Sequence, residues 1–232
     1  WYSLARNMAI AFSRFLPWWR SSRQATTTPV GLWIIRTAVS TLLTFWPPAP
    51  PERQGSIIKS SAHLWQHYRY TLDRDYLKRA FPAMLSAAQF WLDRLVLDKK
   101  DNTYVCPKEY SPEHGPGQED GVAHAQQLVY DLLTNTKSAI EVLGSDAVIS
   151  EADLNLLNDR LSKLDRGLAT EQYTGAWGNP KNGVKSGELL LREWKTSAYT
   201  AGENGHRHMS HLMCVYPFNQ VTPSSPYYQA AV

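Results

Sequence analysis

The sequence predicts an all-α fold. From residue 60 onward, apolar residues recur at three- and four-residue steps in several stretches, which is the periodicity of amphipathic helices. Capping residues and glycines bound these stretches, and no run of alternating strands is seen between them. Two long polar segments rich in Gly and Pro, 99–118 and 170–205, separate the helices. Loops of this length in a compact helical domain usually carry function, so we expect the chemistry in loops at one end of a helix array.

Residues 1–58 form an atypical N-terminal segment. Its first 51 residues contain five Arg and no Lys, Asp or Glu, and it contains a proline-rich stretch at 47–51. The rest of the chain holds 19 basic and 21 acidic residues, which are interleaved, so we expect no nucleic-acid surface. The apolar run 31–46 carries Arg36 and is shorter than the roughly 20 residues that a membrane-spanning helix needs. We therefore expect no membrane span, and we divide the chain into 1–58 and 59–232.

Four helices are expected in the second part. The first spans 63–72. Asp73 is placed to cap the second, whose apolar positions extend to residue 95, and Pro82 is expected to kink or divide this helix. The third runs from about 119 to 143 and ends at Gly144.

The fourth helix is predicted to begin at Ser150. The residues 150–153, Ser-Glu-Ala-Asp, resemble a capping box with Asp in the position of Glu. Leucines at 154, 157, 161 and 164 form an apolar stripe, and Gly167 follows the end of the pattern.

The first long polar segment contains candidate acid residues. Glu113 lies between a proline and a glycine-containing turn, so its backbone is constrained. A positioned carboxyl in a loop rich in aromatics can act as a general acid, because burial raises its pKa toward the working range. Glu109 and Glu119 compete for this role, and an exposed loop glutamate is the simpler interpretation of Glu113 from the local sequence alone.

A cluster of imidazoles follows the second long segment. His206, Arg207, His208, Ser210 and His211 fall within six positions. Three interpretations are open: a metal site, a helix N-terminus in which the histidines satisfy loop carbonyls, and a clamp that donates hydrogen bonds to a ligand. The spacing matches no standard zinc pattern and no acidic residue lies within it, so we expect neither a metal nor a cofactor. The cluster alone indicates a site for a polar ligand.

Four segments share an order and spacing with a known family. They are His-Leu-Trp-Gln-His-Tyr-Arg-Tyr-Thr at 63–71, Ser-Pro-Glu at 111–113, Leu-Arg-Glu-Trp at 191–194, and His-Arg-His-Met-Ser-His-Leu at 206–212 followed by Tyr-Pro at 216–217. Together they resemble the catalytic domain of the family 95 glycoside hydrolases, the α-L-fucosidases of the 1,2-linkage type. The resemblance covers residues from about 60 to 232. It implies an incomplete (α/α)6 barrel of antiparallel helices with long functional loops.

The resemblance also implies roles for individual residues. In that family a terminal fucosyl linkage is hydrolysed with inversion at the anomeric carbon. Glu113 would be the general acid that protonates the leaving oxygen, and Arg207 and His208 would hold the hydroxyls of the sugar. The remaining candidates, for the pocket or for the structure around it, are Trp65, Trp194, His206 and His211.

The functional expectation is a fragment of an inverting exo-glycoside hydrolase that removes terminal α-linked L-fucose from glycans. The family's base lies in an Asp-Gly-Asn-Phe-Gly type motif that this sequence does not contain, so we expect the chain alone to be inactive. The alternatives are a non-catalytic carbohydrate-binding remnant, a related L-galactosidase, a helical-barrel glycoside phosphorylase, and a helical scaffold with structural histidines. The expected partner is a fucosylated oligosaccharide or glycan, and only the resemblance indicates a periplasmic or secreted location.

Overall fold

The computed structural model describes residues 54–112, 115–174, 185–198 and 208–231, which belong to one compact unit, Ala49–Val232. Side chains are described from Ala62 onward. The helices and strands, in chain order, are α3 (Gln54–Thr71), α4 (Arg74–Arg94), β1 (Val96–Asp98), β2 (Thr103–Val105), α5 (Ala123–Leu143), η2 (Gly144–Asp146), α6 (Glu151–Ser162), β3 (Thr170–Gln172), β4 (Leu189–Leu191), η4 (Ser210–Cys214) and α7 (Tyr228–Ala231).

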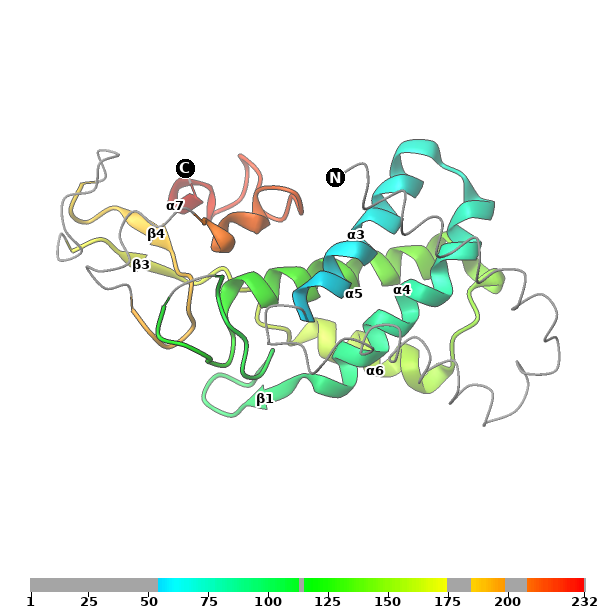
Figure 1. Ribbon diagram of the computed structural model, residues 1–232, viewed down its shortest axis with the longest axis horizontal. Coiled ribbons are helices and arrows are strands. Elements are labelled where there is room, and N and C mark those ends of the chain that lie inside the picture. Colours follow the sequence, from blue (N-terminus) through cyan, green and yellow to red (C-terminus); the bar gives the residue numbers. More distant parts are fainter. Residues whose placement is uncertain (1–53, 113–114, 175–184, 199–207, 232) are drawn as a thin grey trace. The chain divides into compact units, whose positions relative to one another are not determined.

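The helices carry the main core. The three long helices α3, α4 and α5 pack against one another, and α6 packs on α4 and α5 (Figure 1). Trp91 of α4, Leu128 of α5 and Leu157 of α6 are each at most 1% exposed in one apolar cluster. The structure is thus mostly helical, as predicted, while the (α/α)6 arrangement stays a prediction.

The predicted helix caps are confirmed. Asp73 accepts a hydrogen bond from the backbone N–H of Tyr76 at 2.8 Å, and Ser150 accepts one from Asp153 at 3.0 Å. These side chains satisfy amide groups that have no partner within the first turn. Gly144 ends α5 with φ at 54°, a conformation that glycine adopts at little cost.

Two helix starts differ from the prediction. The first helix begins at Gln54 rather than at residue 63, and the third begins at Ala123 rather than near 119. Pro82 does not divide α4, which continues to Arg94. Phe81 and Met84, on either side of the exposed proline, are buried, and this tertiary packing offsets the backbone hydrogen bond that proline removes.

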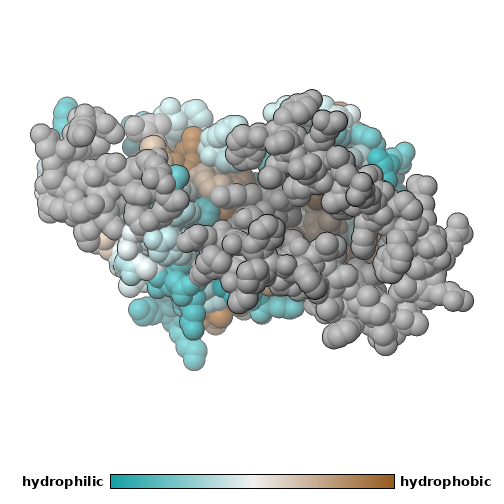
Figure 2. Space-filling model, viewed as in Figure 1, coloured by the Kyte–Doolittle hydropathy of each residue, from teal (hydrophilic) through white to brown (hydrophobic). Residues whose placement is uncertain are grey.

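Short strands that the sequence did not indicate lie within the two polar segments and directly before the first of them. Antiparallel β1 and β2 pair Val96 with Val105, and antiparallel β3 and β4 pair Thr170 with Leu191. Each strand has only three residues, so none is long enough to show a recognisable alternation. The surface around the β1–β2 hairpin is largely hydrophilic (Figure 2).

A glycine brings the turn after α6 against the start of α5. Gly167 has φ at 63°, and a Cβ atom there would lie 2.7 Å from both Cα and the carbonyl oxygen of Ala123. Only glycine allows this approach without displacing the backbone of α5. Gln127 of α5 donates a 3.0 Å hydrogen bond to the carbonyl of Gly167, which fixes the turn.

No helix in the described part of the chain is long and apolar enough to cross a membrane.

Candidate active site

The loop that carries Glu113 is closed at its base. Glu109 and Glu119 exchange two backbone hydrogen bonds of 3.0 Å, so residues 110–118 form a loop with fixed ends. Glu113 itself lies outside the described residues, but both of its flanks are placed. Ser111 is fully buried, and the carbonyl of Pro112 accepts a 3.1 Å hydrogen bond from the hydroxyl of Ser210.

The residue pair Glu193-Trp194 contacts this loop on both sides of Glu113. Before it, the Ser111 hydroxyl donates to Oε1 of Glu193. After it, Gly115 has φ at 107°, and a Cβ atom there would overlap Cζ2 of the Trp194 ring. Glu193 and Trp194 are each 1% exposed, so the loop rests on a buried pair.

The histidine segment approaches the same pair. His211 belongs to the 3-10 helix η4, and its Nδ1 lies 3.6 Å from Oε2 of Glu193. His208 precedes η4, so it does not share a helical turn with His211. His206 and Arg207 lie outside the described residues. Among the residues that the structure describes, no group of three or more His, Cys, Asp or Glu side chains is arranged to hold a metal ion.

Two buried amides hold these segments on α5, and the sequence analysis missed both. Gln127 donates to the carbonyl of His211 at 2.7 Å and accepts from the backbone N–H of Cys214 at 2.8 Å. Gln126 accepts from the backbone N–H of Cys106 at 2.6 Å. Both are fully buried within an otherwise apolar stretch of α5, and that contrast was the available signal.

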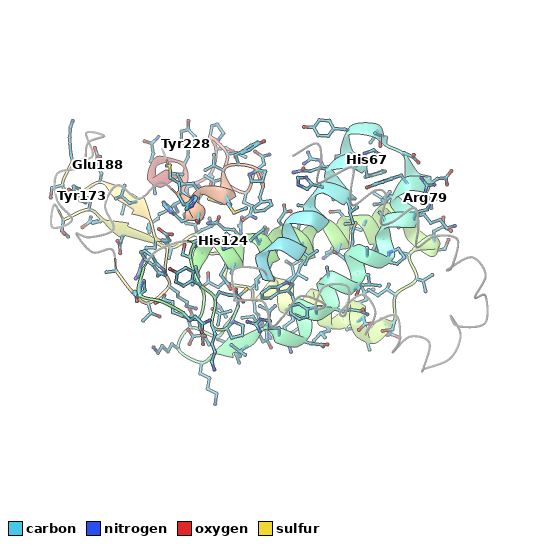
Figure 3. All side chains as sticks on the ribbon, in the orientation of Figure 1. His67, Arg79, His124, Tyr173, Glu188 and Tyr228 are labelled. Carbon is cyan, nitrogen blue, oxygen red and sulfur yellow. The ribbon has the colours of Figure 1, made fainter. Side chains whose placement is uncertain are left out.

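The start of α5 is therefore the scaffold of the candidate site. Its backbone N–H at Ala123 donates a 3.0 Å hydrogen bond to the carbonyl of Glu193. His124 is in the first turn of this helix, whereas His67 of α3 and Arg79 of α4 lie toward the other end of the helix layer (Figure 3).

The two competing carboxylates have structural partners. Glu109 is 5% exposed and its Oε1 lies 3.0 Å from Nη2 of Arg94. Burial raises the pKa of Glu109, and the hydrogen bond and charge of Arg94 oppose this effect. Glu119 accepts hydrogen bonds from the backbone N–H of Thr196 at 2.9 Å and from the hydroxyl of Ser197 at 2.6 Å. Each carboxylate therefore ties the loop base to another segment.

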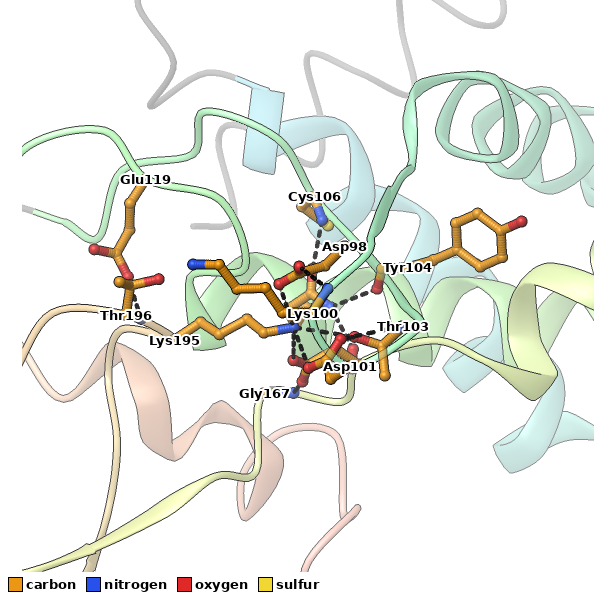
Figure 4. Close-up of polar contacts among 12 residues, drawn as sticks. Asp98, Lys100, Asp101, Thr103, Tyr104, Cys106, Glu119, Gly167, Lys195 and Thr196 are labelled. Carbon is orange, nitrogen blue, oxygen red and sulfur yellow. Dashed lines mark hydrogen bonds and ion pairs between the residues drawn. The ribbon is translucent and has the colours of Figure 1, made fainter.

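An ion cluster fixes the residue that follows the buried pair. Nζ of Lys195 lies 2.7 Å from Asp101, 3.1 Å from Asp165 and 3.2 Å from Asp98, and it donates to the Thr103 hydroxyl at 3.0 Å (Figure 4). The lysine side chain is 17% exposed. The cluster joins the β1–β2 hairpin, the turn after α6 and the segment that carries the site.

Trp65 lies apart from these segments. It is partly buried on α3, and it lines a separate cleft of about 280 Å³ together with residues of α5 and of the segment 217–220. No residue of 111–116, 193–194 or 208–211 that the structure describes lines this cleft. The structure therefore does not bring Trp65 together with the flanks of Glu113.

Asp131 of α5 lines that cleft, and its ionisation should affect the stability of the protein. Burial raises the pKa of Asp131 to about 7, although Asn135 donates a 2.8 Å hydrogen bond to it and Arg69 is nearby. Because the pKa of Asp131 is higher in the folded than in the unfolded chain, the folded state holds its proton more tightly. The free energy of unfolding should therefore fall as the pH rises from about 4 to 7. We expect Asp131→Asn to raise the unfolding free energy by about 2 kcal/mol at pH 8 and to change it little near pH 3.5.

Urea unfolding at the two pH values measures this difference. Asp153→Asn is the control, because Asp153 also accepts a side-chain hydrogen bond, from Gln89 at 2.9 Å, and its variant should show no such gain at pH 8. An equal effect of Asp131→Asn at both pH values would show that the ionisation of Asp131 does not control stability.

Comparison with known proteins identifies the family. Residues 56–232 match the glycosyl hydrolase family 95 catalytic domain. The chain is 33% identical over 163 residues to probable alpha-fucosidase A of Aspergillus niger, and 29% identical over 174 residues to alpha-L-fucosidase 2 of Arabidopsis thaliana. These alignments cover 68% and 69% of this chain but only 18% of each relative. The family match over 56–232 agrees with the four matching segments of the sequence, three of which meet near the start of α5. The chain therefore belongs to glycosyl hydrolase family 95.

Proposed function

We propose that this chain supplies the general acid and part of the sugar pocket of an inverting α-L-fucoside hydrolase. One observation carries the proposal: Ser111-Pro112, Glu193-Trp194 and Ser210-His211 meet, although 82 and 98 residues separate the hydrogen-bonded partners Ser111–Glu193 and Pro112–Ser210. Membership of family 95 and similarity to two proteins named as fucosidases support the substrate class.

Glu113 is the proposed acid because its flanks are held and its competitors are engaged elsewhere. Ser111 and Gly115 contact the buried pair on either side of it, whereas Glu109 pairs with Arg94 and Glu119 binds the segment 196–197. In the proposed reaction Glu113 protonates the oxygen of the leaving group as the bond to the anomeric carbon breaks.

Arg207 and His208 are the proposed sugar contacts. A guanidinium and an imidazole donate hydrogen bonds to hydroxyl oxygens, and His208 adjoins η4, whose Ser210 binds the acid loop. Inversion further requires a base that activates water on the opposite face of the ring, with the two carboxyl groups roughly 6.5–9.5 Å apart.

The stereochemistry of hydrolysis tests the proposal. The longest natural form of the protein that contains this chain is incubated with an α-1,2-linked fucosyl oligosaccharide, and proton NMR follows the first sugar released. We expect β-L-fucose first, because a single displacement inverts the α linkage. Release of α-L-fucose first would contradict inversion.

Two further outcomes separate the alternatives. If the matching α-L-galactoside is hydrolysed faster than the fucosyl oligosaccharide, L-galactose rather than fucose is the preferred sugar. Saturable binding of the oligosaccharide without release of any sugar would favour a carbohydrate-binding role, and the absence of binding would overturn the proposal.

A further inference from the structure

Glu193 is a buried carboxylate whose two oxygens face different segments. It is 1% exposed, and a carboxylate is costly to bury unless both oxygens have partners. Oε1 accepts the hydrogen bond of the Ser111 hydroxyl, two residues before Glu113. Oε2 lies 3.6 Å from Nδ1 of His211, three residues after His208. One side chain thus connects the loop of the proposed acid to the segment of the proposed sugar contacts.

The backbone of Glu193 is held independently of its side chain. Its carbonyl accepts a 3.0 Å hydrogen bond from Ala123, so the residue is anchored to the start of α5. The neighbouring Trp194 is equally buried and lies under Gly115. A change of the Glu193 carboxylate would therefore alter the connection between the two segments without removing the anchor itself.

We propose that Glu193 is a positioning residue for general-acid catalysis, acting on Glu113 through Ser111 and on the sugar-binding segment through His211. The inference rests on the proposed function. An ionised carboxylate accepts hydrogen bonds at both oxygens, whereas the amide of Gln presents one acceptor and one donor. Glu193→Gln therefore keeps the volume of the side chain but removes its negative charge and one of its two acceptor oxygens, which weakens the connection between the two segments.

The readout, measured in the longest natural form of the protein that contains this chain, is the dependence of the rate on the leaving group. An oligosaccharide leaving group must be protonated as it departs, whereas fluoride departs without protonation. A displaced acid loop should slow the first reaction only. We expect Glu193→Gln to lower kcat for the fucosyl oligosaccharide on the order of 10-fold to 100-fold, with little change in kcat for α-L-fucosyl fluoride, because a misplaced catalytic group loses rate of this size.

Ser111→Ala is the second variant. It removes the hydroxyl that Glu193 binds and leaves the carboxylate and His211 in place, so it should reproduce the selective loss. The double variant should lose little more than either single one, because both break the same connection. If Glu193→Gln does not fold, the selective loss must appear in Ser111→Ala alone, and its absence there overturns the inference.

Glu109→Gln is the matched control. Glu109 is also buried and ion-paired, with Arg94 at the base of the same loop, but it contacts neither Ser111 nor His211. We expect it to lower the unfolding stability while the ratio of the two rates stays that of the wild type. Equal losses on both substrates in Glu193→Gln and Ser111→Ala would mean that Glu193 has only a structural role. If Glu113→Gln itself shows no selective loss, the proposed function fails rather than the role of Glu193.

Discussion

Glu113→Gln is expected to lower kcat/KM for an α-L-fucosyl oligosaccharide on the order of 10³-fold, because the amide cannot protonate the leaving oxygen. Glutamine keeps the size of glutamate, so Ser111 and Gly115 can hold the loop in place as before. The lost rate should therefore report the missing proton and not a collapsed loop. Binding of the oligosaccharide, measured by calorimetric titration, should change by less than about threefold if Arg207 and His208 supply the sugar contacts.

A substrate with fluoride as the leaving group provides the decisive comparison. Because fluoride departs without protonation, Glu113→Gln should retain most of the wild-type rate on α-L-fucosyl fluoride. Glu141→Gln is the control, since Glu141 is exposed on α5 and should leave both rates unchanged. Equal losses on the two substrates, or wild-type rates on both, would remove Glu113 from the role of acid.

Local signals predicted the helix caps well. Asp73 and Ser150 act on amides within three residues of themselves, so the relevant chemistry lies in a short stretch of sequence. Asp153 shows the limit of such signals. Its side chain was expected to complete a capping box, yet it accepts a hydrogen bond from Gln89, a residue of α4. A partner 64 residues away cannot be recognised from local spacing.

The strands and the start of α5 were missed for a similar reason. The three-residue strands form because their partners are close in space, with Thr170 opposite Leu191. The polar residues 119–121 were assigned to a helix, whereas the Glu119 carboxylate binds residues 196–197 and its backbone pairs with Glu109. Long-range contacts decided the local structure in both places, against a predicted loop at β3 and β4 and against a predicted helix at 119–121.

The sequence motifs named candidate site residues but not the contacts between their segments. The motifs indicated Glu113, Trp194 and the histidine segment, and the structure places the described parts of these motifs around Glu193. Glu193 belongs to the Leu-Arg-Glu-Trp motif at 191–194, but the sequence indicated no role for it, because its partners Ser111 and His211 lie far from it along the chain. Trp65 was a candidate for the pocket or for the structure around it, and it lines a cleft together with residues of α5 and of the segment 217–220.

Lys195→Met is expected to lower the free energy of unfolding by about 3 kcal/mol at pH 7, because it leaves Asp98, Asp101 and Asp165 close together without their shared cation. A backbone hydrogen bond from Lys100, and the ammonium of Lys195, lower the pKa of Asp98. Partial burial acts against the charged form of Asp101, yet hydrogen bonds from Lys195 and Thr103 lower its pKa overall. Burial likewise opposes the charge of Lys195, and its acidic partners nevertheless raise its pKa.

The direction of these shifts sets the pH range of the effect. Lowered carboxylate pKa values contribute stability above about pH 4 that is lost as the pH falls, and the raised pKa of Lys195 contributes stability that is lost above about pH 10. Urea unfolding should therefore show the full deficit of Lys195→Met between about pH 5 and pH 10 and a much smaller one near pH 3. Lys78→Met is the matched control. The side chain of Lys78 is 53% exposed and lies 2.8 Å from Asp146, so water and salt screen this pair and the loss of stability should be much smaller. A deficit of Lys195→Met that is the same at pH 3 and pH 7 would mean that the charge of Lys195 does not account for the stability that the cluster contributes.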